Sequence, residues 1–274
     1  MQQCDKTHDL PGLPPGGPAP MSAQPAGANR GAIPAMTHAQ RMARAQDKRS
    51  ALLSFLASGE VWTTAEIAAQ VMGVSRRRAL DALMAMARDA LIASEALPLA
   101  GRLLTLYGIT PHGCAVADAF DCPHFEKSRT NPSWVEHRVA GQRLRLAAEA
   151  AGWRDWLPER ALRVRAAQEG WKKIPDAVAT SPTGEVVAIE VERHCKTPKR
   201  YSELWLAYLQ DMKAGRFRKV DFVCPAGVEV LVARAMARVT HVKLNGEAVA
   251  ITEAHRARFG YFNFCNWPGE NHGR

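Results

Sequence analysis

The sequence predicts an α/β (α+β) protein in which a mostly helical N-terminal region precedes a region with a mixed sheet. Residues 38–91 carry apolar side chains at helical spacing, and residues 153–252 alternate short apolar strands with amphipathic helices. The chain has 274 residues, 47% of them hydrophobic, which is enough for one large domain or two small ones.

Positive charge dominates, because Lys and Arg number 36 against 27 for Asp and Glu, a net charge of +9. A protein this basic is expected to meet a polyanion. No apolar run approaches the roughly 18 residues that a membrane span needs. The first thirty residues also lack the apolar core of a signal peptide. We therefore expect a cytoplasmic protein without a membrane span.

Proline and glycine mark the segments that are expected to lie outside the domains. Residues 1–37 hold seven prolines and five glycines and are predicted to be a disordered tail. Residues 119–132 are predicted to be a linker between two domains, and residues 266–274 a short C-terminal tail.

Residues 38–118 are predicted to form a winged helix-turn-helix domain that binds DNA. A first helix covers residues 38–58. A second helix begins at a cap formed by Thr63 or Thr64 and reaches about Met72. A glycine then turns the chain into a third helix, which is the order of a helix-turn-helix unit.

The third helix is predicted to contact DNA through its first turn. A recognition helix enters the major groove by its N-terminal end, where arginine and the helix dipole both favour phosphate. The opposite face would turn to the core through Leu80, Leu83, Met84 and Ala87. The cap and three arginines expected at the DNA are Ser75, Arg76, Arg77 and Arg78.

Two strands over residues 91–96 and 103–109 are expected to form the wing, and Thr110 and Pro111 to open a closing helix. A plain helical bundle explains the same caps and arginines and stays the alternative.

A second domain is predicted over residues 133–265 as a mixed sheet with helices. A helix over 133–150 opens it. The remaining elements expected are strands at 153–165, 171–179 and 185–192, a helix at 197–212, a strand at 220–223, a helix at 228–239 and a strand at 248–252.

Three acidic residues of this second domain lie within or at the ends of predicted strands. Asp176 is expected in the middle of one strand, and Glu190 and Glu192 end the next. Alternation along a strand puts both glutamates on one face, which Asp176 could approach. Carboxylates brought together repel unless they share a proton or bind a divalent cation. Oxygen ligands favour Mg²⁺ or Mn²⁺, which can help ionise water for attack on a phosphodiester.

These residues carry a family resemblance. Pro175-Asp176, followed by Ile189-Glu190-Val191-Glu192-Arg193, resembles the PD-(D/E)xK nuclease fold. With Ile109-Thr110-Pro111-His112-Gly113 and Glu136-His137, the order resembles the replication-relaxation family, and within it the plasmid mobilization relaxases of MobC type, over roughly residues 40–225.

The resemblance implies metal-dependent nicking of one strand at a plasmid transfer origin. It implies duplex origin DNA as partner, together with other relaxosome or coupling proteins. The acids it points to as metal ligands are Asp176, Glu190, Glu192 and, as an additional acid on the helix over 133–150, Glu136, preferred over Glu149.

The sequence departs from the nuclease pattern at Glu192, where that pattern has lysine. Lys196 or Lys199 could supply the ammonium group that stabilises developing charge, or Glu192 could be a further metal ligand. If neither holds, the domain is a binding fold without cleavage.

Basic residues follow the acids. Eight Lys or Arg lie from Arg193 to Lys219. Arg193 and Arg200 are expected to contact DNA phosphates, and the alternative is that these charges form a solvated helix face.

Tyr201 and Tyr208 are candidates for a covalent nucleophile or for core residues. His137 could be a general base, although a hydrogen-bonded histidine on the helix is preferred. Three tryptophans are expected in the core: Trp171, Trp205 and Trp267.

The number and spacing of the cysteines favour free thiols over a metal site or disulfides. His112-x-Cys114 and Cys122-x-His124 could together bind zinc, but their one-residue gaps are tighter than usual. The six cysteines of this long chain are expected to stay reduced.

The sequence thus predicts a relaxase-like endonuclease that recognises an origin and nicks one strand with Mg²⁺ or Mn²⁺. The alternatives are a non-catalytic origin-binding accessory protein or transcriptional regulator with a degenerate nuclease fold, and a replication initiator that nicks. The oligomeric state stays open, although inverted half-sites would suit a dimer.

Overall fold

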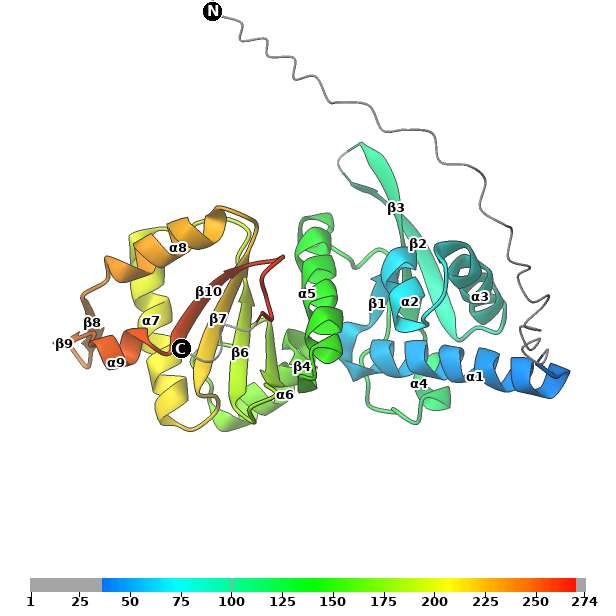
Figure 1. Cartoon of the computed structure of the whole chain (residues 1–274), viewed down its shortest axis with the longest axis horizontal. Coiled ribbons are helices and arrows are strands. Elements are labelled where there is room, and N and C mark those ends of the chain that lie inside the picture. The colour runs from blue at the N-terminus through cyan, green and yellow to red at the C-terminus, as the bar shows by residue number, and fades with distance from the viewer. Residues whose placement is uncertain (1–35, 100, 270–274) are drawn as a thin grey trace, which may run out of the picture. The chain divides into compact units, whose positions relative to one another are not determined.

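A computed structural model describes residues 36–99 and 101–269. Helices combine with sheets of three, five and two strands, which confirms the predicted mixed class of helices and sheets (Figure 1). The described residues from His38 onward form one compact unit, and nearly all of the predicted tail over 1–37 lies outside the described residues. No helix in the described part is long and apolar enough to cross a membrane.

The N-terminal region combines helices with an antiparallel sheet in the order β1-β3-β2. Thr64 and Ser75 cap the two central helices by accepting hydrogen bonds from backbone N–H groups, so both predicted caps are confirmed. The strand β1 was not expected. The elements are α1 (His38–Phe55), a π-helical turn η1 (Leu56–Glu60), β1 (Trp62–Thr64), α2 (Ala65–Val71), α3 (Arg76–Arg88), β2 (Ile92–Leu99), β3 (Arg102–Ile109) and α4 (Pro111–Val116).

Helix α3 turns one narrow face to the core. Ala79, Leu83 and Met86 are buried, at helical spacing. The prediction that Met84 faces the core is wrong, because this side chain is 57% exposed. Met84 follows Leu83 directly and therefore lies about 100° around the helix from the buried face.

Helix α4 packs close to the backbone that precedes β2. Thr110 accepts a hydrogen bond from the N–H of Gly113 at 3.0 Å, which confirms the predicted helix start. A Cβ at Gly113 would lie 2.1 Å from the carbonyl oxygen of Leu91. Only glycine allows this approach.

The predicted linker contains no helix or strand over residues 119–131, yet it packs on β3 through the buried Phe125. The expectation of free thiols is wrong for Cys114 and Cys122, which form a disulfide. The chain after α4 folds back and brings their Cα atoms within 6.4 Å. The free cysteines in the described part are Cys195, Cys224 and Cys265.

The C-terminal region is built on a five-stranded mixed sheet in the order β10-β7-β6-β5-β4. β6, β7 and β10 run parallel, whereas β4 and β5 pair antiparallel. The elements are α5 (Pro132–Ala150), β4 (Arg154–Pro158), α6 (Glu159–Glu169), β5 (Ala177–Thr180), β6 (Val186–Val191), α7 (Pro198–Lys213), β7 (Lys219–Cys224), α8 (Val228–Ala237), β8 (His241–Leu244), β9 (Glu247–Ala250), α9 (Glu253–Arg256) and β10 (Phe259–Asn263).

Helices cover both faces of this sheet (Figure 1). α7 and α8 lie on one face, where Trp205 and Val232 share a core cluster with Phe222. α5 lies on the other face, where Leu144 shares a cluster with Ile189. Alternate residues of β6 therefore enter different clusters, as period-two alternation predicts.

Several predicted elements differ from the structure. The strand expected at 153–165 is β4 followed by helix α6, whose Leu162 and Ala166 are buried four residues apart. The strand expected at 171–179 begins only at Ala177. The late strand β9 pairs with β8 outside the main sheet, and β10 was not expected.

Two of the three tryptophans expected in the core, Trp205 and Trp267, are buried, and Trp171 is partly buried. Trp267 donates a hydrogen bond from its indole N–H to Asp221 at 2.9 Å. The packed chain therefore extends past residue 265.

Candidate functional site

Two carboxylates meet where β5 begins and β6 ends. Ala177 pairs with Ile189 in the antiparallel ladder, so Asp176 and Glu190 occupy the next positions across the two strands. Both line a pocket of about 390 Å³, which also receives Lys173 and Glu192. The prediction that Asp176 lies in the middle of a strand is wrong, because Asp176 directly precedes β5.

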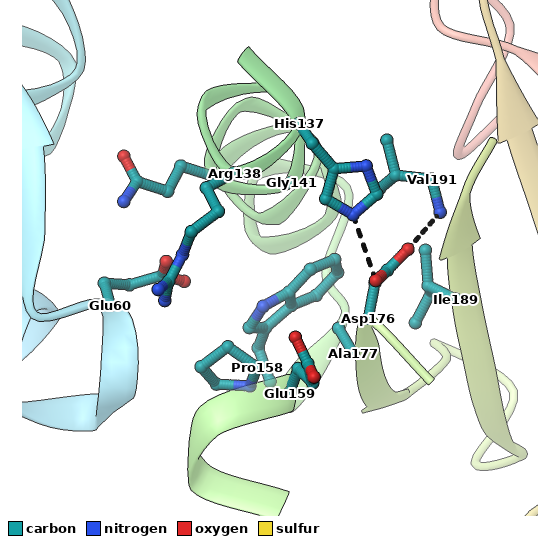
Figure 2. Close-up of a pocket in the computed structure, with 12 residues that line it drawn as sticks. Glu60, His137, Arg138, Gly141, Pro158, Glu159, Asp176, Ala177, Ile189 and Val191 are labelled. Atoms are coloured by element: carbon teal, nitrogen blue, oxygen red, sulfur yellow. Dashed lines mark hydrogen bonds and ion pairs between the residues drawn. The ribbon is translucent and has the colours of Figure 1, made fainter. Parts of the chain in front are cut away.

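Asp176 is held by two donors (Figure 2). The Nε2 atom of His137, on α5, lies 3.0 Å from Oδ1, and the N–H of Val191 donates to Oδ2 at 2.8 Å. Burial alone would raise the pKa of Asp176, but the hydrogen bond and charge of His137 outweigh it and lower this pKa. The site thus keeps Asp176 ionised.

Glu190 has the opposite electrostatic setting. Its side chain is buried, with the ammonium group of Lys173 at 2.9 Å and the hydroxyl of Tyr208 as a second donor. Burial raises the pKa of Glu190, and the charge of Asp176 raises it further against the opposing charge of Lys173. Two neighbouring carboxylates with pKa values shifted in opposite directions are typical of a chemically active site.

Glu192 and Lys196 form an ion pair at the same pocket. Lys199 is exposed and does not line the pocket, so of the two predicted lysines the structure brings only Lys196 to the acids. Lys173 was missed by the sequence reasoning. Its one sequence signal is its position three residues before Asp176, and the strand predicted over residues 171–179 gives no reason to group it with the acids.

Glu136 does not join the other acids. It forms an ion pair with Arg193 at 2.6 Å and does not line the pocket of Asp176. Successive α-helical residues point about 100° apart, so Glu136 and His137 of α5 cannot both face Asp176. Arg193 does line that pocket, as does Arg200, whose guanidinium pairs with Glu203 at 2.9 Å.

Asp176 and Glu190 are a pair of carboxylates whose oxygens are ligands suited to Mg²⁺ or Mn²⁺. Within residues 36–99 and 101–269, no group of three or more His, Cys, Asp or Glu side chains is gathered as a metal site would require. However, Mg²⁺ usually retains several waters and needs only one or two carboxylates in addition to substrate phosphates. Asp176 and Glu190 fit that smaller donor set.

Both candidate tyrosines on α7 are fully buried. The hydroxyl of Tyr208 donates to Glu190, and that of Tyr201 accepts a hydrogen bond from the N–H of Lys196 at 3.0 Å. Neither tyrosine lines the pocket. Burial raises the pKa of both hydroxyls, which disfavours the phenolate that a nucleophile needs.

The predicted DNA-contacting residues of α3 lie on its exposed first turn. Arg77 and Arg78 are exposed, whereas Arg76 forms an ion pair with Glu66 at 2.7 Å. Arg76 also lines a groove of about 710 Å³ that reaches Arg193. The same groove therefore touches α3 and the segment after β6.

No model of a known protein family matches this chain, and a search of curated proteins finds no match either.

Proposed function

We propose that this chain binds duplex origin DNA and nicks one strand with a divalent metal ion. The observation that carries the proposal is the pairing of Asp176 with Glu190 in one pocket beside Lys173 and Lys196. Carboxylates of this kind bind a cation, and ammonium groups stabilise the charge that develops on a phosphate under attack.

Asp176 and Glu190 would hold Mg²⁺ or Mn²⁺. The bound ion would polarise the scissile phosphate and lower the pKa of an attacking water. His137 fixes the orientation of Asp176 through its hydrogen bond. Lys173 supplies the ammonium group that the nuclease pattern would place at Glu192, and Arg193 lies where a flanking phosphate would bind.

The N-terminal helices and hairpin support a winged-helix module, with Arg77 and Arg78 at its DNA-facing turn. The mixed sheet supports a domain of PD-(D/E)xK type, since its paired acids lie at the ends of adjacent strands. On this proposal the protein is related to the replication-relaxation family and works with other relaxosome or coupling proteins.

Nicking of supercoiled plasmid tests the proposal. Plasmid carrying the protein's own origin region is incubated with Mn²⁺, Mg²⁺ or EDTA, and open circles are quantified. Asp176→Asn is expected to reduce metal-dependent nicking on the order of a hundredfold. Glu247→Gln, an exposed acid on β9, is the matched control and should nick normally.

Metal binding gives a second, independent readout. Titration calorimetry with Mn²⁺ alone should show binding that Asp176→Asn and Glu190→Gln weaken. Metal-dependent nicking that survives both substitutions would contradict the proposal.

A non-catalytic origin-binding protein is the second candidate. It is favoured by the ion pair of Glu192 with Lys196 and by the lack of a three-ligand group among the residues described. Sequence-specific DNA binding in EDTA, with no nick in Mg²⁺ or Mn²⁺, would establish this alternative.

A further inference from the structure

A second pocket of about 560 Å³ lies beside the acidic site. α5, α6 and the segment 123–131 supply most of its lining, together with Trp62 of β1. We call it the arginine groove, after the four arginines that line it: Arg129, Arg138, Arg160 and Arg163.

Trp134 joins the arginine groove to the acidic site. Trp134 lines both pockets and is 54% exposed, although its side chain is among the largest apolar ones. The ring meets that of His137 edge-on, with centroids 6.4 Å apart, and His137 bonds Asp176. The exposed ring of Trp134 is thus linked to Asp176 through one intervening side chain, that of His137.

Positive charge in the groove is only partly neutralised. Arg129 pairs with Glu126 and Arg163 with Glu159, while the guanidinium of Arg138 lies over the ring of Trp62. The side chain of Arg160 makes no ion pair or hydrogen bond within the described part of the chain. Among the residues that line the groove, four arginines face two glutamates, and the charge of Glu60, which does not line the groove, also acts on Arg138. A bound anion would offset the positive charge that remains.

Arg160 lies among like charges. Burial lowers the pKa of Arg160 first, and the charges of Arg138 and Arg163 lower it further against the opposing charges of Glu159 and Glu126. An anionic ligand would relieve the repulsion among these three guanidinium groups.

We propose that the arginine groove holds an unpaired stretch of the DNA strand, with one base stacked on Trp134 and the adjoining phosphates on Arg160 and its neighbours. The proposal deepens the proposed function and rests on it, because the groove adjoins the pocket where the strand would be nicked. A basic groove with an exposed aromatic ring is the usual design of single-strand binding sites. Duplex DNA offers no free base face to such a ring, since its bases are stacked on one another.

Binding of a fluorescent single-stranded oligonucleotide from the origin region tests this, by anisotropy in EDTA with the full-length protein. Trp134→Ala is expected to weaken binding about tenfold, whereas Trp134→Phe should retain most of it because the aromatic face remains. Phe120→Ala is the matched control, an exposed aromatic side chain outside the groove, and should bind like the unchanged protein.

The charge is tested on helix α6. Arg160→Ala should weaken binding and lower the slope of log Kd against log salt by about 0.7, the value for one phosphate contact on a single strand. Arg165→Ala is the control, because Arg165 lies on the same helix but pairs with Glu169 outside the groove.

Unchanged binding of the single strand by both Trp134→Ala and Arg160→Ala would overturn the inference. It would also be overturned if the duplex of the same sequence bound more tightly than the single strand and both substitutions weakened that duplex binding. The metal-free assay separates this outcome from failure of the proposed function. Strand binding through Trp134 without nicking by the unchanged protein contradicts the nuclease alone, whereas nicking with no effect of either substitution on binding contradicts the groove alone.

Discussion

Glu60 ends the turn η1 as a buried carboxyl group, with Arg145 of α5 at 3.4 Å. Burial raises the pKa of Glu60 and outweighs the charges of Arg145 and Arg138, which lower it. The folded protein therefore keeps this proton to higher pH than the unfolded chain. The free energy of unfolding must then fall as the pH rises from about 4.5 through the folded pKa.

Glu60→Gln removes the buried charge and preserves the shape of the side chain. Arg145 keeps its bond to Glu149 at 2.8 Å, and Arg138 keeps the charge of Glu159 and the ring of Trp62 as neighbours. We expect the variant to be about 1 kcal/mol more stable than the unchanged protein at pH 8, with the difference vanishing near pH 4.5. Urea unfolding at both pH values measures it, and Glu149→Gln is the control without this gain. An equal effect at both pH values would refute the expectation.

Tyr208 is also buried, and its hydroxyl donates a hydrogen bond to Glu190. Tyr208→Phe leaves the ring packing intact but removes a donor to a buried carboxyl group. We expect a loss of about 1.5 kcal/mol in the free energy of unfolding, measured with urea. Tyr107→Phe on β3, where the ring is only partly buried, should cost less than about 0.5 kcal/mol. Equal effects of the two substitutions would contradict the expectation that the hydroxyl of Tyr208 stabilises the fold through Glu190.

At the scale of elements, helix α7 positions the irregular segment that carries Lys173 and Asp176. Asp211 is fully buried on α7 and accepts hydrogen bonds from the backbone N–H groups of Lys172 and Lys173, at 2.9 Å and 3.0 Å. Arg216 completes its shell as an ion pair. Without the carboxylate of Asp211, the backbone N–H groups of Lys172 and Lys173 would lose their hydrogen-bond acceptor.

Asp211→Ala should therefore destabilise the fold by about 3 kcal/mol, because it leaves two N–H groups without an acceptor and removes the carboxylate that pairs with the mostly buried guanidinium of Arg216. Urea unfolding monitors stability. Glu203→Ala, an exposed acid on the same helix, should change it by less than about 0.5 kcal/mol. A similar small effect at Asp211 would show that the segment is held by its neighbours alone.

At the scale of the whole molecule, Gln142 connects the N-terminal sheet to helix α5. It is fully buried, donates to the carbonyl oxygen of Trp62 at 2.6 Å and accepts from the hydroxyl of Thr63 at 2.9 Å. These bonds span about eighty residues of sequence. They link the segments that the sequence assigned to separate domains.

Gln142→Leu is expected to cost about 3 kcal/mol, since it strands a buried hydroxyl and a buried carbonyl. The N-terminal sheet should then unfold before the rest, so calorimetry would show a broadened or double transition in place of one. Gln168→Leu, an exposed position on α6, is the control. A single sharp transition with unchanged midpoint would contradict this role of Gln142.

Most helices could be predicted from the sequence because their signals are local. Ser75, Thr64 and Thr110 cap helices where caps were expected, and the apolar spacing of α7 placed Trp205 in the core. Helix α6 was missed because Arg and Ala dominate it and only two of its residues are buried. Strand β10 was missed because its neighbour in the sheet, β7, lies almost forty residues earlier in the chain.

The acids of the candidate site were recognisable in the sequence, because Asp176, Glu190 and Glu192 lie at the ends of short apolar strands. Their partners were not. Lys173 belongs with Glu190, and His137 with Asp176, only because two strands and two helices converge at one end of the sheet.

The sequence by itself determined the helix starts and the alternation of β6, since each depends on residues close together in the chain. It also determined the basic character of the chain, which is a matter of composition alone. Only the tertiary structure decided which cation meets which carboxylate, that Tyr208 points inward, and that Trp134 faces both pockets. Contacts between segments tens of residues apart depend on packing in three dimensions, and local propensity carries no information about them.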